Sequence, residues 1–374
     1  MLRIALIAAL VVSAPALSQD DAVAFPEELI LLPEEVQNAA RSGLEAEDVS
    51  IPAGLSPGEE AWYRAQVAYM GGDWVPARRY AGTAAVAGLS DAAALAGIMA
   101  RDGRGGPRDM AAASDWFHRA ARQDHPVALY QLGLLARLGD ESLELGSPRI
   151  WFERAARAGH INGMIAFALE LKQSGIPQEA VSARRWAERA AQQGSAEGMY
   201  QLAQMLDDGA GGERDAAGAR VWYGRAAEAG LAEAAFQAGM MWADGEGGEQ
   251  EDGEARRWLR IAAESDYAPA QGQYGLMLYQ GRGGERNLAE AAHWFSRGAR
   301  GGDAESQYLY AFVLAQGEGV NQDLEAAYRW AVAAATDPLG APVHNRDRDR
   351  LQAALERVLP LDVQARMREQ AEAG

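Results

Sequence analysis

The chain has 374 residues, 35 basic against 53 acidic side chains, a formal net charge of -18 and no cysteine. This charge excludes a surface built for nucleic acid or for anionic lipid, because binding to either requires Lys and Arg to replace counterions. The lack of cysteine excludes disulfides and thiolate metal sites, so the fold must be held together by packing.

Residues 1–18 contain a single charged residue, Arg3, and an uninterrupted apolar run over residues 4–12. Small residues follow this run, which is typical of a secretory signal peptide cleaved after Ala16 or Ser18. The run is too short to span a bilayer comfortably. We therefore expect residues 1–18 to be a signal peptide. The mature protein should be exported, periplasmic or secreted, with no stable membrane insertion.

Residues 19–57 are acidic and contain four prolines. This composition predicts a largely flexible leader, because it offers little apolar surface to bury. From residue 58 the sequence becomes rich in alanine with amphipathic spacing, and it predicts helices over 58–70 and 73–86. These two helices form the first predicted hairpin.

An aromatic residue recurs at intervals of 35 or 36 residues over most of the chain, and we call these positions the aromatic ladder. The ladder consists of Tyr80, Trp116, Trp151, Trp186, Trp222, Trp258, Trp294 and Trp330. So regular a period is the signature of a repeat array. Alanines lie three residues before and four and five residues after most ladder positions. This spacing favours rings buried as spacers between successive hairpins over an exposed stacking stripe.

Each period has the same plan, seen most clearly around Trp294. The pattern predicts a first helix, helix A, over 267–279, a Gly-x-Gly-Gly turn at 281–284 and a second helix, helix B, over 288–300. Asn287 suits the N-cap of helix B, and the glycines suit left-handed C-caps.

The repeats predict an all-α protein with a solenoid of about eight hairpins over 58–340, followed by polar C-terminal capping helices within 341–374. The units near Gly139 and Gly175 lose the double-glycine turn, and the ladder spacing falls to 35 there. We expect the array to be least regular between residues 139 and 180.

The consensus of the array is Ala-x-x-Trp-Phe/Tyr-x-Arg-Ala-Ala-x-x-Gly, preceded by helix A and a Gly-x-Gly-Gly/Val turn. It resembles the Sel1-like repeat, a relative of the tetratricopeptide repeat, over roughly residues 60–336. The turn at 317–320 with Asp323, Ala327 and Trp330 is among the closer matches. The resemblance implies a right-handed α-solenoid that acts as a protein-interaction scaffold, often in signalling or envelope processes. Some secreted members carry a disulfide in each repeat, and this chain departs from that branch.

The sequence contains no recognisable catalytic or metal-binding constellation. Its five histidines include no pair four residues apart, and neither His-Glu-x-x-His nor Gly-x-Ser-x-Gly occurs. The Gly-x-Gly-Gly turns follow helices and lack the Gly-Lys-Ser/Thr of a phosphate-binding loop. We therefore predict a protein that is not an enzyme and that uses neither cofactor nor metal. Two alternatives remain open at this point: a cell-wall or β-lactam-processing hydrolase of the secreted Sel1-like type, and a carbohydrate-binding solenoid.

Helix A carries the candidate partner-binding residues. Glutamines recur eight residues before the turn glycine, and aromatic residues come one position earlier. The glutamines are Gln131, Gln201, Gln237 and Gln273, and the aromatics include Tyr200 and Tyr308. In the Sel1-like class helix A lines the concave face, so these side chains would meet a protein or an extended peptide. The alternative is solvated surface for the glutamines and core for the rings. The pattern assigns no oligomeric state.

Overall fold

The structure is a computed structural model, and it describes residues 46, 49–336, 343 and 345–372. The predicted signal peptide over 1–18 and most of the predicted leader over 19–57 lie outside the described residues. The described part consists of α-helices and one short 3-10 helix joined by turns, as an all-α solenoid requires. None of the described helices is long and apolar enough to cross a bilayer.

The chain divides into two compact units, residues 1–167 and 168–374. The first unit contains α4 (Pro57–Met70), α5 (Trp74–Val86), α6 (Ser90–Asp102), α7 (Met110–Ala121), α8 (Pro126–Arg137), the 3-10 helix η1 (Glu141–Leu143) and α9 (Pro148–Arg157). The division falls inside α10 (Ile161–Gln173), within the region where the sequence predicts the least regular repeats. The 3-10 helix η1 also lies in this region, where the sequence loses the double-glycine turn.

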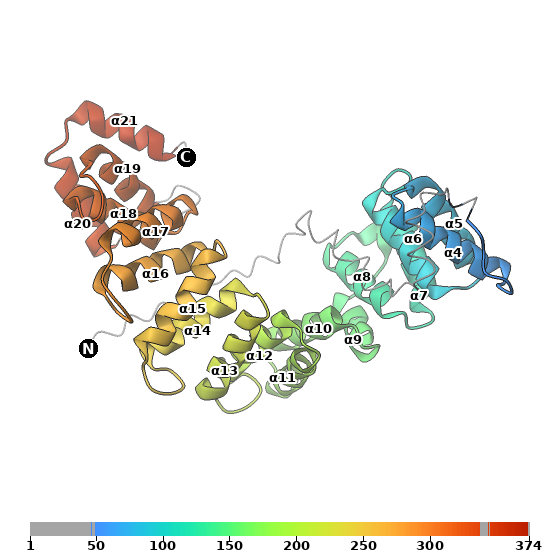
Figure 1. The fold of residues 1–374 in the computed structure, drawn as a ribbon. Coiled ribbons are helices and arrows are strands. Elements are labelled where there is room, and N and C mark those ends of the chain that lie inside the picture. The colour runs from blue at the N-terminus through green and yellow to red at the C-terminus, as the bar shows by residue number, and fades with distance from the viewer. Residues whose placement is uncertain (1–45, 47–48, 337–342, 344, 373–374) are drawn as a thin grey trace. The chain divides into compact units, whose positions relative to one another are not determined.

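The second unit continues the same pattern and ends with two further helices. It contains α11 (Pro177–Gln192), α12 (Ala196–Asp208), α13 (Ala216–Glu228), α14 (Ala232–Asp244), α15 (Asp252–Glu264), α16 (Ala268–Gln280), α17 (Leu288–Arg300), α18 (Ala304–Gln316), α19 (Leu324–Ala334), α20 (Arg346–Glu356) and α21 (Leu361–Glu372). Within each unit, consecutive helices pack against each other as antiparallel hairpins (Figure 1). Both α20 and α21 contact α19.

The Gly-x-Gly turns end helix A and bring neighbouring hairpins together. The first glycine is left-handed, as at Gly281 with φ of 72°, where a side chain would be strained. The second is also left-handed, and at Gly283 a Cβ atom would collide with the backbone carbonyl of Asp252, at the start of helix B of the preceding hairpin. Gly105, Gly211, Gly247 and Gly319 repeat this contact in their own hairpins. The motif is therefore a steric requirement of stacking.

In four hairpins the core contains a glycine of helix A that packs against a large side chain of helix B. That side chain lies one residue after the aromatic ladder and is fully buried. The pairs are Gly97 with Phe117, Gly133 with Phe152, Gly239 with Leu259 and Gly275 with Phe295. A Cβ on any of these glycines would overlap its partner, so the small residue sets the close approach of the two helices.

The ladder residue itself faces the preceding hairpin. The Trp116 ring lies beside Gly82 of the previous helix B, and the Trp258 ring lies beside Gly224 in the same way. Of the eight ladder residues, Trp258 and Trp294 are buried, and the other six are half-buried. The ladder is thus less uniformly buried than the sequence predicts, because six of its eight rings keep part of their surface exposed.

Candidate partner-binding face

The structure does not present the four predicted glutamines as one row. Gln131 is 2% exposed, and its Oε1 accepts a hydrogen bond of 2.6 Å from Arg101 Nη1. Gln201 is 8% exposed, and its Nε2 donates to Glu197 Oε1 at 2.7 Å. Gln237 and Gln273 are half-buried. Two of the four glutamines are therefore committed inside the fold, which leaves Gln237 and Gln273 as the accessible members.

A row that includes the predicted Tyr200 and Tyr308 occupies the A helices of the second unit. A glutamate lies three residues before an aromatic residue at the same position of three helices, so each pair shares one helix face. The pairs are Glu197 with Tyr200 on α12, Glu233 with Phe236 on α14 and Glu305 with Tyr308 on α18. All three rings are half-buried. We call these six residues the Glu–aromatic row.

The row is interrupted at α16, where Pro269 and Gly272 occupy the two positions. Gly272 is required there because a Cβ atom would collide with Ser306 Oγ of α18. Half-buried Tyr267, the residue before α16, lies beside Phe236 with ring centroids 5.4 Å apart. The apolar part of the face therefore continues from α14 toward α16, although the row position of α16 itself has no ring.

Burial and nearby acidic groups raise the pKa of two tyrosines of the row. Burial is the main cause that raises the pKa of Tyr200 to about 12, and Tyr267, Glu197 and Glu233 contribute in the same direction. Glu233 belongs to the next A helix along the stack, so its carboxylate acts across the gap between the two helices. Burial also raises the pKa of Tyr308, with further contributions from Asp347 and Glu305 that Arg348 opposes. The surroundings of the rings are thus apolar and acidic together.

The surface side of the aromatic ladder is covered by arginines of the same helix. Five guanidinium carbons lie 4.5 to 5.5 Å from the ladder ring three residues earlier. They belong to Arg119, Arg154, Arg189, Arg225 and Arg297. Cation–π contacts of this kind occupy the ring face that a sugar would stack on. This arrangement disfavours the carbohydrate-binding alternative.

A second set of arginines connects each hairpin to the next turn. Arg184 Nη2 donates to the carbonyl oxygens of Met205 at 3.1 Å and Glu213 at 3.2 Å. Arg78, Arg220 and Arg256 hold the same position, two residues before the ladder, and each donates to a turn carbonyl 29 residues later. The sequence analysis missed these residues, although their regular place before the ladder would have identified them. Their role is to fix the turns.

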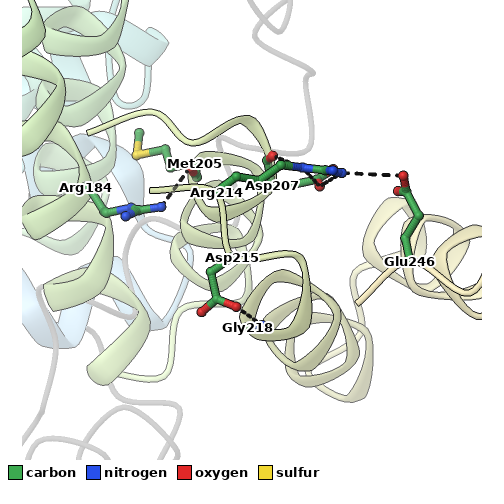
Figure 2. A network of polar contacts seen from close by, with 7 residues as sticks. All are labelled: Arg184, Met205, Asp207, Arg214, Asp215, Gly218 and Glu246. Carbon is green, nitrogen blue, oxygen red and sulfur yellow. Dashed lines mark hydrogen bonds and ion pairs between the residues drawn. The ribbon is translucent and has the colours of Figure 1, made fainter. Parts of the chain in front are cut away.

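Figure 2 shows how one turn is connected to its neighbours. Arg214 Nη2 lies 2.7 Å from Asp207 Oδ1 and 3.4 Å from Glu246 Oε1 in the next turn. Asp215 caps α13 by accepting a hydrogen bond from Gly218 N at 2.8 Å. Each charged side chain in this network already has a bonding partner. They stabilise the turn without offering a reactive group.

Two histidines of the first unit serve as helix caps. His125 Nδ1 accepts from Ala128 N at the start of α8, and its Nε2 lies 3.0 Å from Asp91 Oδ1. His160 caps α10 through Gly163 N in the same way. Within the residues that the structure describes, no group of three His, Cys, Asp or Glu side chains is placed to hold a metal ion.

The Sel1 repeat model matches seven segments of the chain, which together span more than half of its length. They are residues 90–125, 149–160, 166–195, 196–231, 232–267, 268–303 and 304–337. The chain belongs to the Sel1 repeat family. Sel1 repeat proteins generally mediate interactions between proteins, and their scaffolds are typically non-catalytic. None of the curated proteins is similar enough to match this sequence.

Two solved structures resemble the fold of this Sel1 repeat protein over most of its length. A protective antigen of uropathogenic Escherichia coli with an SLR fold is 24% identical, with a TM-score of 0.70. The similarity covers 91% of this chain and 75% of that one. A Sel1 repeat protein from Oxalobacter formigenes is also 24% identical, with a TM-score of 0.59, over 86% of this chain and 89% of that one. At this level of identity the similarity concerns the fold alone.

Proposed function

We propose that this Sel1 repeat protein is an exported, non-catalytic scaffold that binds a basic segment of another protein along the Glu–aromatic row. The observation that carries the proposal is the repetition of a glutamate and a half-buried ring on three A helices of one unit. Rings provide apolar contact area at low entropic cost, and a rim of charge selects the partner. Repetition along a stack suits an extended or helical segment better than a small molecule.

The charge of the second part of the chain supports a basic partner. Residues 138–374 contain 24 basic and 36 acidic side chains. Lys or Arg side chains of the partner would lie beside Glu197, Glu233 and Glu305 while its apolar side chains cover the rings. Opposite charges at a rim accelerate association and are screened by salt, so added salt should weaken the complex.

Export is part of the proposal and is supported by the apolar segment at residues 1–18, which has the composition of a signal peptide. An exported scaffold of a Gram-negative cell meets the periplasmic domains of membrane proteins. We therefore propose an envelope regulator that binds the periplasmic domain of a membrane partner such as a sensor.

The experiment is site-specific photocrosslinking in intact cells. A photoreactive phenylalanine replaces Phe236 in the row, and the matched control replaces Val221, a 54% exposed side chain on α13. We expect a crosslinked partner from position 236 and none from position 221, with the crosslinked peptide, identified by mass spectrometry, rich in Lys and Arg. Crosslinks of equal yield at both positions, or to acidic segments, would count against the row as the binding site.

The charge contribution is tested with the purified partner domain. The variant E197Q/E233Q/E305Q should bind about tenfold more weakly and with less salt dependence, because three rim charges are lost. The variant E213Q/E249Q/E285Q removes three exposed carboxylates at the same 36-residue spacing from the turns, and it should bind as the parent does. Equal weakening in the two variants would reduce the effect to net charge and contradict a site on the row.

A further inference from the structure

The end of helix B contains a left-handed position that is glycine in most hairpins and aspartate in two. Eight residues after the ladder the backbone is left-handed, and glycine fills this position at Gly88, Gly159, Gly194, Gly230 and Gly302. Asp124 and Asp266 occupy it instead, with φ of 51° and 61°. A left-handed aspartate is strained relative to glycine, so a compensating contact is expected there.

The compensating contact is an ion pair with the next hairpin. Asp124 Oδ1 accepts from Arg154 Nη2 at 2.7 Å, and Asp266 Oδ1 accepts from Arg297 Nη2 at 2.6 Å. Both arginines lie three residues after their ladder ring, over which they also stack. The repeat thus defines a carboxylate position next to this arginine.

Between the first and second hairpins the arginine is present and the carboxylate is not. Arg119 lies over Trp116, and the residue that corresponds to Asp124 is Gly88. The space beside it is a cavity of about 230 Å³ lined by Arg119, Arg122, Gln123, Gly88, Leu89 and Ala93 among others. Among the described residues, neither Arg119 nor Arg122 has an ion-pair partner. Asp91, close in sequence, is bonded to His125 Nε2.

Two other arginines at this repeat position also face a glycine, but neither has a second arginine three residues later. Three residues after Arg189 stands Gln192, and three after Arg225 stands Glu228. The distribution of charged residues along the chain also favours binding of an anion near the first hairpins. Residues 57–137 contain nine basic and eight acidic side chains, whereas the remainder to residue 374 is strongly acidic.

We propose that this cavity, the Arg119 pocket, binds a carboxylate on a short apolar stem. The guanidinium groups of Arg119 and Arg122 would donate to the carboxylate, as Arg154 does to Asp124. The stem would contact Leu89 and Ala93. Two sources share this chemistry: the C-terminal residue of a protein segment, and a free aliphatic dicarboxylate. The Arg119 pocket is separate from the Glu–aromatic row, so the two proposals stand or fall independently.

The test follows the arginine Nε–Hε signals of the full mature chain by nuclear magnetic resonance. The probes are N-acetylvaline, which resembles a chain terminus, its neutral amide, and glutarate. We expect N-acetylvaline or glutarate to shift the Arg119 signal saturably, while the amide does not. The more tightly binding acid identifies the source. The Arg297 signal, already paired with Asp266, serves as an internal control and should not move.

Substitution of Gly88 is the decisive part of this binding test. Gly88→Asp places the chain's own carboxylate in the pocket, so it should weaken probe binding at least about tenfold. Gly88→Asn imposes the same backbone strain without charge and should keep most of the affinity. R119Q and R122Q should each weaken binding as well, and they keep the test available if the Gly88 variants fail to fold. The proposal is wrong if the amide binds as the acids do, if Arg297 shifts as much as Arg119, or if Gly88→Asn and Gly88→Asp lose affinity equally.

Discussion

The first two hairpins, α4 to α7, and the A helices from α12 to α18 are built from one repeat. They nevertheless offer opposite chemistry at the surface. The first pair exposes two unpaired guanidinium groups beside a glycine, and the second exposes half-buried rings beside glutamates. Their cores are the same: a glycine of helix A lies against Phe117 in one and against Phe295 in the other. A repeat array fixes the positions that stacking needs and leaves the remaining positions free to specialise.

The largest effect is expected when the core that the two regions share is truncated. Phe117→Ala and Phe295→Ala should each cost about 3–5 kcal/mol of unfolding free energy, because both rings are fully buried and leave a cavity against a glycine. Urea unfolding followed by circular dichroism measures the loss. Val221→Ala on the exposed surface should change the free energy by less than about 0.5 kcal/mol. A cost at Phe117 far below that at Phe295 would mean that the two cores are not equivalent.

A smaller loss is expected at the turns. Gly105→Ala and Gly283→Ala should each cost about 1–3 kcal/mol, because the new Cβ meets a backbone carbonyl of the preceding hairpin and the backbone is left-handed. Gly253→Ala is the control, since its Cβ would meet no atom within 4 Å. The same urea titrations compare the three variants. A control as damaging as the turn variants would show that glycine content, and not stacking contact, sets the effect.

Alkaline pH should act mainly on the region that carries the row. The pKa of Tyr200 is raised to about 12 in the folded state from an ordinary value of 10.0, chiefly by burial. Folding thus favours the protonated phenol, so this stabilisation is present below pH 10 and is lost as pH rises toward 12. Thermal melts from pH 9 to 12 should show a falling melting temperature, with a smaller fall in Tyr200→Phe. An identical fall in the parent and the variant would exclude Tyr200 as a contributor.

The smallest effect is expected at the left-handed aspartates. Asp266→Gly breaks the exposed pair with Arg297 and also removes the strain of a left-handed side chain, so the net change should stay within about 1 kcal/mol. Asp124→Gly should behave alike against Arg154. High-precision urea unfolding at low and high salt separates the two terms, because only the ion pair is screened. A loss that persists unchanged at high salt would mean that the aspartate acts through packing.

Local patterns made the repeat readable from the sequence. The predicted helices over 267–279 and 288–300 correspond to α16 and α17 of the structure, within one residue at each end. Asn287 accepts from Glu290 N as a helix cap. Caps, left-handed glycines and amphipathic spacing act over a few residues, so they can be recognised without knowing what packs on them.

The binding residues were less accessible to such reasoning. Gln131 and Gln237 hold the same position of the repeat, yet one is bonded to Arg101 inside the fold and the other is half-buried. The glutamates of the Glu–aromatic row were visible in the sequence at the same period. Their significance depends on the tertiary structure, which leaves a half-buried ring beside each of them.

The sequence by itself determined the period, the hairpins, the turn glycines and the all-α fold, because each depends on neighbours within one or two helical turns. Only the tertiary structure decided which of the repeated side chains already have a bonding partner within the fold. Whether Arg119 or Arg154 has a carboxylate depends on a residue about 30 positions earlier in the chain, at the end of the preceding helix B. A contact of that range is created by stacking, and so are the face and the pocket proposed here.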